Sequence, residues 1–327
     1  MQKGKIGILL INLGTPEATD FWSMRRYLRE FLSDKRVIEA KGPVWWLVFN
    51  GIILTRKPRS SGKAYAKIWN RERDESPLKT ITRSQAEKLA SGYQANPEIE
   101  VDWAMRYGKP SIAQGMESLA DKGCDRLLLF PLYPQYSAAT TASAMDRVFD
   151  TLKTMRHQPT LRMVPPYYDH PAYIDAITTS LRDHLARLAW QPDAIIASLH
   201  GLPQAFIDKG DPYQQQCEAT VAQLCKTLGK DILLTYQSRS GRAVWIGPDT
   251  EETLVELARA GQKNVVIIAP GFAADCVETL EELQIRAAKA FVENGGKNFS
   301  MVPALNDSET SLSLLRNLAD QQLCNWA

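Results

Sequence analysis

One histidine and two glutamates are the strongest candidates for acid–base chemistry. Of the four histidines, only His200 lies at the end of an expected strand, beside Gly201. An imidazole titrates near neutral pH, so His200 could pass protons to and from a substrate, although a lone histidine is more often structural. Glu278 and Glu282 share one face of an expected helix, near its N-terminus, where negative charge is favoured. The alternative is a solvated acidic helix start, an interpretation that we accept for Glu281.

Three more charged residues fall at or just after expected strand ends. Arg106 and Arg239 each precede a glycine by two residues, and they either hold a carboxylate or carry surface charge. Asp275 either caps the helix that follows or joins the acidic group. Because ligands bind beyond the carboxyl ends of parallel strands, we expect these side chains in one pocket with apolar walls. Such a pocket suits acid–base chemistry and metal binding.

Short apolar runs rich in Ile, Leu and Val supply the strand ends. The runs are residues 6–13, 126–132, 194–199, 232–236 and 264–269, with 101–107 as a weaker sixth. Helical patterns separate them, and strands that alternate with helices imply crossover connections and a parallel sheet covered on both faces. The sequence therefore predicts an α/β fold.

Two stretches of the chain share one pattern. In residues 110–131 a proline precedes a capping box, an apolar helix face, a glycine that ends the helix, and an apolar strand. The same order recurs 138 residues later, in residues 248–270. The capping boxes are Ser111 with Gln114 and Asp249 with Glu252, and the glycines are Gly123 and Gly261. The strand end Leu13-Gly14-Thr15-Pro16 likewise resembles His200-Gly201-Leu202-Pro203. We infer two similar α/β domains that face each other across a cleft.

The expected N-terminal domain comprises residues 1–150 together with a C-terminal helix, 306–327, that packs back on it. Residues 151–305 form the second domain, which carries His200 and Glu278. The first domain has about fifty additional residues, including an apolar lip at about 42–54 that contains Trp45 and Trp46. The lip is too short to cross a bilayer. It is either a buried core helix or a mobile cover over an apolar ligand that touches a membrane surface.

Composition excludes several classes of protein. Lys and Arg number 39 against 37 Asp and Glu, without the basic stripe of a nucleic-acid binder. The mildly basic zone around Arg56 suits an anionic small molecule or lipid headgroups. The five cysteines are scattered without a C-x-x-C pair, which indicates a reducing, cytoplasmic location. No secretion signal, membrane span, nucleotide-binding glycine motif or serine-hydrolase elbow is evident.

Several strings, in order along nearly the whole chain, resemble ferrochelatases. They are Leu13-Gly14-Thr15-Pro16-Glu17, Ser76-Pro77-Leu78, Met105-Arg106-Tyr107-Gly108, Pro131-Leu132-Tyr133-Pro134-Gln135-Tyr136-Ser137, Ser198-Leu199-His200-Gly201-Leu202-Pro203, Tyr236-Gln237-Ser238-Arg239, and Pro270-Gly271-Phe272 through Glu278-Thr279-Leu280-Glu281-Glu282. The resemblance implies two Rossmann-like domains, each a four-stranded parallel sheet flanked by helices. It also implies the insertion of Fe²⁺ into protoporphyrin IX or coproporphyrin III, which forms haem and releases two protons.

The resemblance assigns roles to matching positions. His200 matches the active-site histidine, as base or metal ligand, and Glu278 the glutamate that faces it. Glu282 and Asp275 match an acidic path behind them, which completes the expected metal-binding set. The expected porphyrin-binding residues are Leu13 under the macrocycle, Arg106 and Tyr107 at its edge and face, Arg56 near the propionates, and Tyr136, Ser137, Gln237 and Arg239 in the matching strings. A site of this kind needs apolar walls and a few polar contacts at the rim.

Some positions depart from the resemblance. Cys276 stands where some relatives have a second histidine, so a mechanism with two histidines is not expected. Relatives with a [2Fe–2S] cluster use cysteines near the C-terminus. Here only Cys324 lies there and Ala138 replaces another cysteine, so neither a cluster nor an organic cofactor is expected. Ser240 stands where an apolar residue is common.

The expected partners are a porphyrin and ferrous iron, with peripheral membrane contact and a monomer or weak dimer as the assembly. The alternative functions are a catalytically silent porphyrin or metal carrier and a bilobal small-molecule binding protein unrelated to tetrapyrroles. Retention of His200 together with Glu278 argues against the carrier. The acidic motif and the absence of a signal peptide argue against the binding protein.

Overall fold

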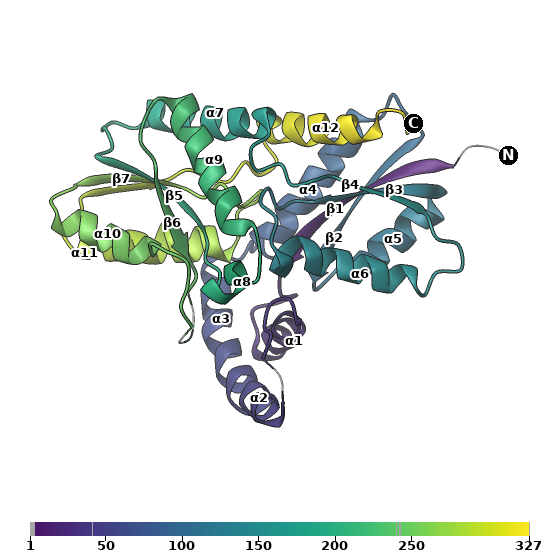
Figure 1. Ribbon diagram of the computed structural model, residues 1–327, viewed down its shortest axis with the longest axis horizontal. Helices are drawn as coiled ribbons and strands as arrows, with labels where there is room; N and C mark the ends of the chain where they lie inside the picture. Colours follow the sequence, from purple (N-terminus) through teal and green to yellow (C-terminus); the bar gives the residue numbers. More distant parts are fainter. Residues whose placement is uncertain (1–3, 41, 240, 242, 327) are drawn as a thin grey trace. The chain divides into compact units, whose positions relative to one another are not determined.

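The protein, seen in a computed structural model that describes residues 4–40, 42–239, 241 and 243–326, divides into two compact units (Figure 1). Unit 1 comprises residues 1–133, 138–165 and 315–327, and unit 2 comprises residues 134–137 and 166–314. The sequence places the main boundary at residue 150 and the whole C-terminal helix in the first domain. In the structure the boundary lies at residue 165, and the division falls within that helix.

Unit 1 is built on a parallel sheet with the strand order β2-β1-β3-β4. The strands are β1 (Lys5–Gly14), β2 (Ile99–Tyr107), β3 (Cys124–Pro131) and β4 (Thr160–Met163). The central strand β1 is almost wholly buried, because helices cover both faces of the sheet. The helical segments are α1 (Phe21–Leu32), α2 (Pro43–Val48), η1 (Phe49–Ile53), α3 (Leu54–Ile68), α4 (Pro77–Gly92), α5 (Ile112–Asp121), η2 (Ala138–Ala142), α6 (Ser143–Leu152) and part of α12 (Glu309–Leu323).

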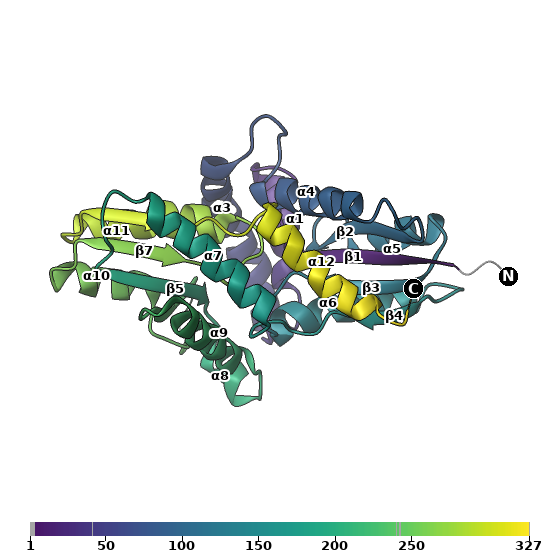
Figure 2. The same cartoon turned by 90° about the horizontal axis from the view of Figure 1, so that it is seen from above.

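Alternation along β1 sends successive side chains to opposite faces of this sheet. Leu9 and Ile11 pack in one core cluster with residues of α5 and α6, among them Met116. Asn12 points to the other face, where its side chain donates a hydrogen bond to Thr82 of α4 over 3.0 Å. Figure 2 shows α4 and α6 on opposite sides of the strands. The end of β1 is therefore fixed from both faces.

Unit 2 repeats the architecture with the strand order β6-β5-β7-β8, again all parallel. The strands are β5 (Ala194–His200), β6 (Leu233–Gln237), β7 (Asn264–Ile268) and β8 (Asn298–Met301). The helical segments are α7 (Pro171–Arg187), α8 (Gln204–Asp208), α9 (Tyr213–Leu228), α10 (Thr250–Arg259), η3 (Glu278–Ala287), α11 (Ala288–Glu293) and the start of α12. Ile196, Val265, Ile267, Leu254 and Phe291 belong to its core cluster.

The internal repeat is present in three dimensions. Ser111 and Gln114 form a capping box at the start of α5, and the side chain of Asp249 accepts from the backbone of Glu252 over 3.0 Å at the start of α10. Gly123 and Gly261 follow these helices with φ of +86° and +93°, as expected for glycines that end a helix. Two four-stranded parallel sheets flanked by helices confirm the predicted fold class.

The apolar lip is not a buried core helix, so that alternative is wrong. No residue of α2 is buried, and Val44, Trp46 and Leu47 are 73%, 62% and 62% exposed. Ile52 in the following turn is half exposed. Across the described ranges, no helix combines the length and apolar character that spanning a bilayer requires.

Candidate active site

His200 and Glu278 belong to unit 2 and act on each other electrostatically. His200 is the last residue of β5, and Glu278 opens η3. Burial lowers the pKa of the His200 imidazole below its usual range, while the negative charge of Glu278 raises it in part. The imidazole is therefore neutral at neutral pH, and a carboxylate is placed to stabilise the cation it forms on accepting a proton.

Gln237 ties the start of η3 to the two strands beside it. Its side-chain nitrogen donates to the backbone carbonyl of Glu278 over 3.1 Å, and its side-chain oxygen accepts from the Ser198 hydroxyl over 2.7 Å. Gln237 is also the partner of His200 in the register between β6 and β5. Because the side chain is fully engaged and buried, its effect on the site is to hold Glu278 near His200. Direct contact between Gln237 and a substrate stays a prediction.

Glu282 lies one turn along η3, with its carboxylate bound by Ser238. The backbone nitrogen and the hydroxyl of Ser238 each donate to Glu282 over 2.7 Å, and Arg286 lies 3.0 Å away. Burial raises the pKa of Glu282, although Ser238 and Arg286 oppose this. Because its pKa is raised, Glu282 takes up a proton more easily than an exposed glutamate does. The segment is a π-helix rather than the expected α-helix. Such helices are rare in proteins, and those that occur are often at functional sites.

Asp275 is occupied by neighbouring residues of unit 2. Its carboxylate accepts from the Thr279 hydroxyl over 2.9 Å, from the backbone of Ala304 over 3.3 Å and from the Asn306 amide over 2.7 Å. These bonds tie the segment before η3 to the segment after β8. In the part of the chain that the structure describes, no three His, Cys, Asp or Glu side chains gather closely enough to hold a metal ion. The expected metal set therefore stays a prediction.

Cys276 lies beside Glu278 but cannot replace a second histidine as a base. Burial raises the pKa of its thiol well above the usual value, and the charge of Glu278 and a hydrogen bond to it add to this effect. The thiol therefore stays protonated. Ser240 lies outside the described residues.

Three other expected binding residues of unit 2 are engaged within the unit. The backbone nitrogen of Tyr136 donates to Gln216 over 2.7 Å, and the hydroxyl of Ser137 donates to Asp211 over 2.9 Å. Arg239 lies 3.4 Å from Asp249 and 3.5 Å from Glu252, and it lines a hollow of about 490 Å³ together with Glu282. Their contact with substrate stays a prediction.

Trp245, which no sequence motif marks, lies against Gly201, the glycine beside His200. A Cβ atom at Gly201 would stand 3.3 Å from the indole of Trp245 and 2.9 Å from the backbone oxygen of Gln237. Trp245 also forms an isolated antiparallel bridge with Pro203. Close packing thus favours glycine at position 201. Trp245, which packs against it, belongs to the long loop that follows β6.

In unit 1, Leu13 is half-buried near the end of β1, and Arg56 is exposed on α3. The next residue, Gly14, has a φ of +113°, and a Cβ there would stand 1.8 Å from the backbone oxygen of Tyr107. Only glycine fits this position. Tyr107 therefore packs directly against the backbone beside Leu13.

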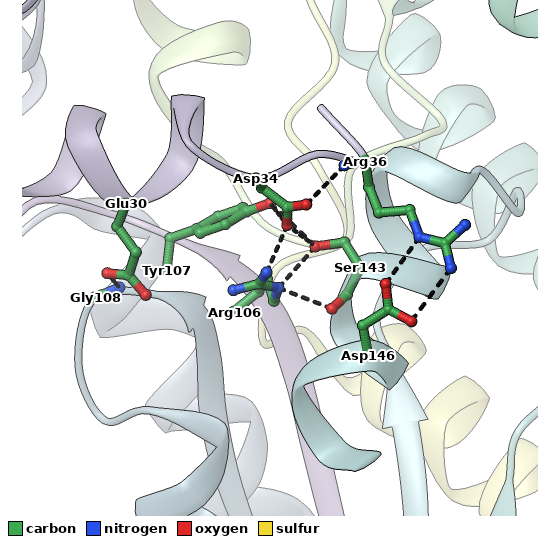
Figure 3. Close-up of polar contacts among 8 residues, drawn as sticks. All are labelled: Glu30, Asp34, Arg36, Arg106, Tyr107, Gly108, Ser143 and Asp146. Atoms are coloured by element: carbon green, nitrogen blue, oxygen red, sulfur yellow. Dashed lines mark hydrogen bonds and ion pairs between the residues drawn. The ribbon is translucent and has the colours of Figure 1, made fainter. Parts of the chain in front are cut away.

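Arg106 and Tyr107 join a polar network within unit 1 (Figure 3). Arg106 does hold a carboxylate, but it is that of Asp34 from the same chain, at 2.5 Å. The Tyr107 ring has no exposed surface, and its hydroxyl donates to Asp34 over 2.8 Å. The resemblance implies that Tyr107 lies at the face of the macrocycle. In this structure its ring is buried and presents no free face to a ligand.

Comparison with known proteins shows to which family the chain is similar. The sequence model of the ferrochelatase family matches residues 5–323. The chain is 51% identical to the ferrochelatase of Chelativorans sp. over 100% of its own length and 94% of the relative, and 52% identical to that of Nitrobacter hamburgensis over 98% and 94%. Among solved structures, SirB from Bacillus subtilis has a TM-score of 0.55 at 11% identity, covering 98% of this chain and 96% of that chain. CbiX, described as the terminal enzyme of sirohaem biosynthesis in denitrifying bacteria, has a TM-score of 0.52 at 12% identity, over 97% and 98%. These two likenesses show the fold.

Proposed function

The chain belongs to the ferrochelatase family, and we propose that its own residues carry out the insertion of Fe²⁺ into a porphyrin. The product is haem, and two protons leave the pyrrole nitrogens as the metal binds. Family membership makes the protein a metal chelatase, a lyase. The observation that carries the proposal is that the charge of Glu278 acts on the imidazole of His200, which burial keeps neutral at the end of a parallel strand.

His200 is the proposed base. Its lowered pKa keeps the imidazole free to accept a pyrrole N–H proton at neutral pH. Glu278 stabilises the imidazolium that results, and as a carboxylate it also suits a divalent cation stripped of water. Glu282 is the proposed next acceptor, since burial raises its pKa towards that of a group that can hold a proton. Asp275 is proposed to complete the acidic path. Its carboxylate would then have to exchange hydrogen bonds that it now accepts from Thr279, Ala304 and Asn306.

The proposed substrate is protoporphyrin IX or coproporphyrin III, bound with Leu13 under the macrocycle and Arg56 near a propionate. The macrocycle is a large apolar disc, and the exposed apolar lip of unit 1 suits an apolar substrate or the surface of a bilayer. Val44, Trp46, Leu47 and Ile52 supply the apolar contacts, and Arg56 follows on α3 as a cation for anionic headgroups. We propose peripheral membrane contact through this lip, a cytoplasmic location, and a monomer or weak dimer.

An anaerobic assay with ferrous iron and protoporphyrin tests the proposal. Wild-type protein should form the metalloporphyrin, and His200→Ala should lose this activity while it still binds the porphyrin. His157→Ala is the matched control, because His157 is an exposed histidine outside the site. Tight porphyrin binding by the wild type without turnover would instead support the silent carrier.

A further inference from the structure

Four buried side chains of unit 2 form a continuous series of hydrogen bonds that ends at the backbone of Glu278. The hydroxyls of Thr235 and Thr250 lie 2.9 Å apart, and that of Thr250 lies 2.8 Å from the Ser198 hydroxyl. Ser198 in turn lies 2.7 Å from the side-chain oxygen of Gln237, whose side-chain nitrogen donates to the Glu278 carbonyl over 3.1 Å. None of the four residues is more than 2% exposed. We refer to the three hydroxyl residues as the hydroxyl chain.

The donor in each of these bonds follows from the end at Glu278. The Glu278 carbonyl can only accept, so Gln237 turns its side-chain nitrogen toward it and its oxygen toward Ser198. Because that oxygen also only accepts, Ser198 donates its one hydroxyl proton to it. Thr250 then donates to Ser198, and Thr235 donates to Thr250. The hydrogen bonds therefore run in one direction, and they hold the Gln237 amide in one orientation.

The hydroxyl chain lies on the face of β5 that carries the candidate base. Ile196, Ser198 and His200 alternate along this strand, so their side chains point to the same face of the sheet. Ile196 packs in the core cluster with Leu254 of α10 and Leu283 of η3. Ser198 therefore lies between the apolar core of unit 2 and His200.

Unit 1 has apolar residues where unit 2 has the hydroxyl chain. Three positions of unit 1 match by strand order, register and helix start: Ile11 matches Ser198, its register partner Ala104 matches Thr235, and Ile112 at the start of α5 matches Thr250. All three are fully buried in one core cluster of unit 1. The scaffold therefore forms without hydroxyls at these positions. Burial of a polar group costs free energy unless it is hydrogen-bonded, so the chain in unit 2 serves something other than the architecture.

We propose that Ser198 and Thr250 are positioning residues of the active site, which hold Gln237 in the orientation that fixes the backbone of Glu278 at the start of η3. The proposal rests on the proposed function, because it takes Glu278 as a group that takes part in metal insertion. Both residues are buried, and they act through Gln237 rather than on a substrate. Their effect is to keep the carboxylate of Glu278 where its charge reaches His200.

Steady-state kinetics of Fe²⁺ insertion into protoporphyrin, under anaerobic conditions, test the proposal. Ser198→Ala leaves the Gln237 oxygen without its donor and should lower kcat about tenfold, the effect of one lost hydrogen bond, with KM for the porphyrin within about twofold. Thr250→Val keeps the shape of the side chain without the hydroxyl and should lower kcat about threefold. Thr250→Ser keeps the hydroxyl and should behave as wild type.

A double-mutant cycle distinguishes positioning from a general loss of structure. Glu278→Gln keeps the backbone carbonyl that Gln237 binds but lacks the charge. In that background Ser198→Ala should lower kcat by no more than about twofold further. Thr178→Val is the matched control, because Thr178 is a buried threonine of α7 whose hydroxyl has no hydrogen-bond partner among the described residues. It should behave as wild type.

The same tenfold loss from Ser198→Ala with and without the Glu278 charge would overturn the proposal. Unchanged kcat in Ser198→Ala, an effect confined to KM, or a Thr250→Ser variant as slow as Thr250→Val would overturn it as well. If Ser198→Ala does not fold, the cycle uses Thr250→Val, with about a threefold loss expected in the wild-type background and none in Glu278→Gln.

If the wild type proves inactive, the proposed function fails separately, and hydrogen exchange decides on the positioning alone. Amides at the start of η3 should exchange about tenfold faster in Ser198→Ala than in wild type, because the segment loses part of its anchor, while those of α7 stay unchanged. Equal exchange rates at the start of η3 would show that the hydroxyl chain does not hold it.

Discussion

The two units have the same strand order but end their central strands differently. In unit 1 the strand end carries Leu13 before Gly14, and in unit 2 the matching position carries His200 before Gly201. In unit 1 the carboxylate of Asp34 accepts hydrogen bonds from Arg106, Tyr107, Ser143 and the backbone of Arg36, and it is not aimed at a proton donor outside this network. In unit 2, burial lowers the pKa of His200, and the charge of Glu278 acts in the opposite direction. The neutral imidazole is therefore free to accept a proton. One scaffold thus carries an apolar residue at one strand end and a titratable residue at the matching strand end, and the side chains decide what each can do.

Exchange of the two strand-end residues should produce the largest effect. His200→Leu places the residue of unit 1 at the matching position of unit 2, and removal of the general base should lower kcat by roughly 10³-fold. Leu13→His should not restore activity in the double variant, because the carboxylate that acts on His200 is supplied by η3 of unit 2. Steady-state rates of metalloporphyrin formation measure both changes. Activity of His200→Leu within tenfold of wild type would show that the difference between the units is not catalytic.

The two glycines should differ in their effect on stability. Gly14→Ala forces a Cβ to within 1.8 Å of a backbone oxygen at a φ of +113°, so we expect a loss of about 3 kcal/mol in the free energy of unfolding. Gly201→Ala meets the backbone of Gln237 at 2.9 Å without a positive φ, so about 1 kcal/mol is expected. Urea denaturation of both variants provides the measurement. A larger loss for Gly201→Ala would reverse the order derived from the packing.

Substitution of the two glutamates of η3 should lower kcat to different extents, with the larger loss at Glu278, whose charge acts on His200. Glu278→Gln removes the charge that acts on His200, and we expect kcat to fall roughly 10²-fold. Glu282→Gln keeps one of the two acceptor oxygens that Ser238 uses and should lower kcat by less, about fivefold, below the usual range of general acid–base effects. The same assay ranks the two variants. Equal losses would indicate that the acidic path acts as one unit rather than in sequence.

Local signals in the sequence predicted much of this structure. The apolar runs become the strands, and Ser111 and Gly123 bound α5 as expected, because capping and helix ends depend on a few adjacent residues. The place of His200 at a strand end was also predictable.

Contacts between distant segments could not be predicted in the same way. Asp34 is 72 residues from Arg106 in the chain, and nothing near it in sequence marks its partner. The contact of Trp245 with Gly201 depends on how a long loop folds back. The sequence indicates a helix that begins near Glu278, but no local pattern in it distinguishes the observed π-helix from an α-helix.

The pH dependence of kcat/KM tests the central claim most directly, that a neutral His200 tuned by Glu278 accepts the pyrrole protons. Activity should rise with pH as His200 loses its proton, with a midpoint below about 6.5, because burial lowers the pKa of this imidazole. Glu278→Gln should move the midpoint lower still, since the charge that raises this pKa is gone, while His157→Ala should leave the profile unchanged. A midpoint above 6.5, or one that does not move in Glu278→Gln, would contradict the account.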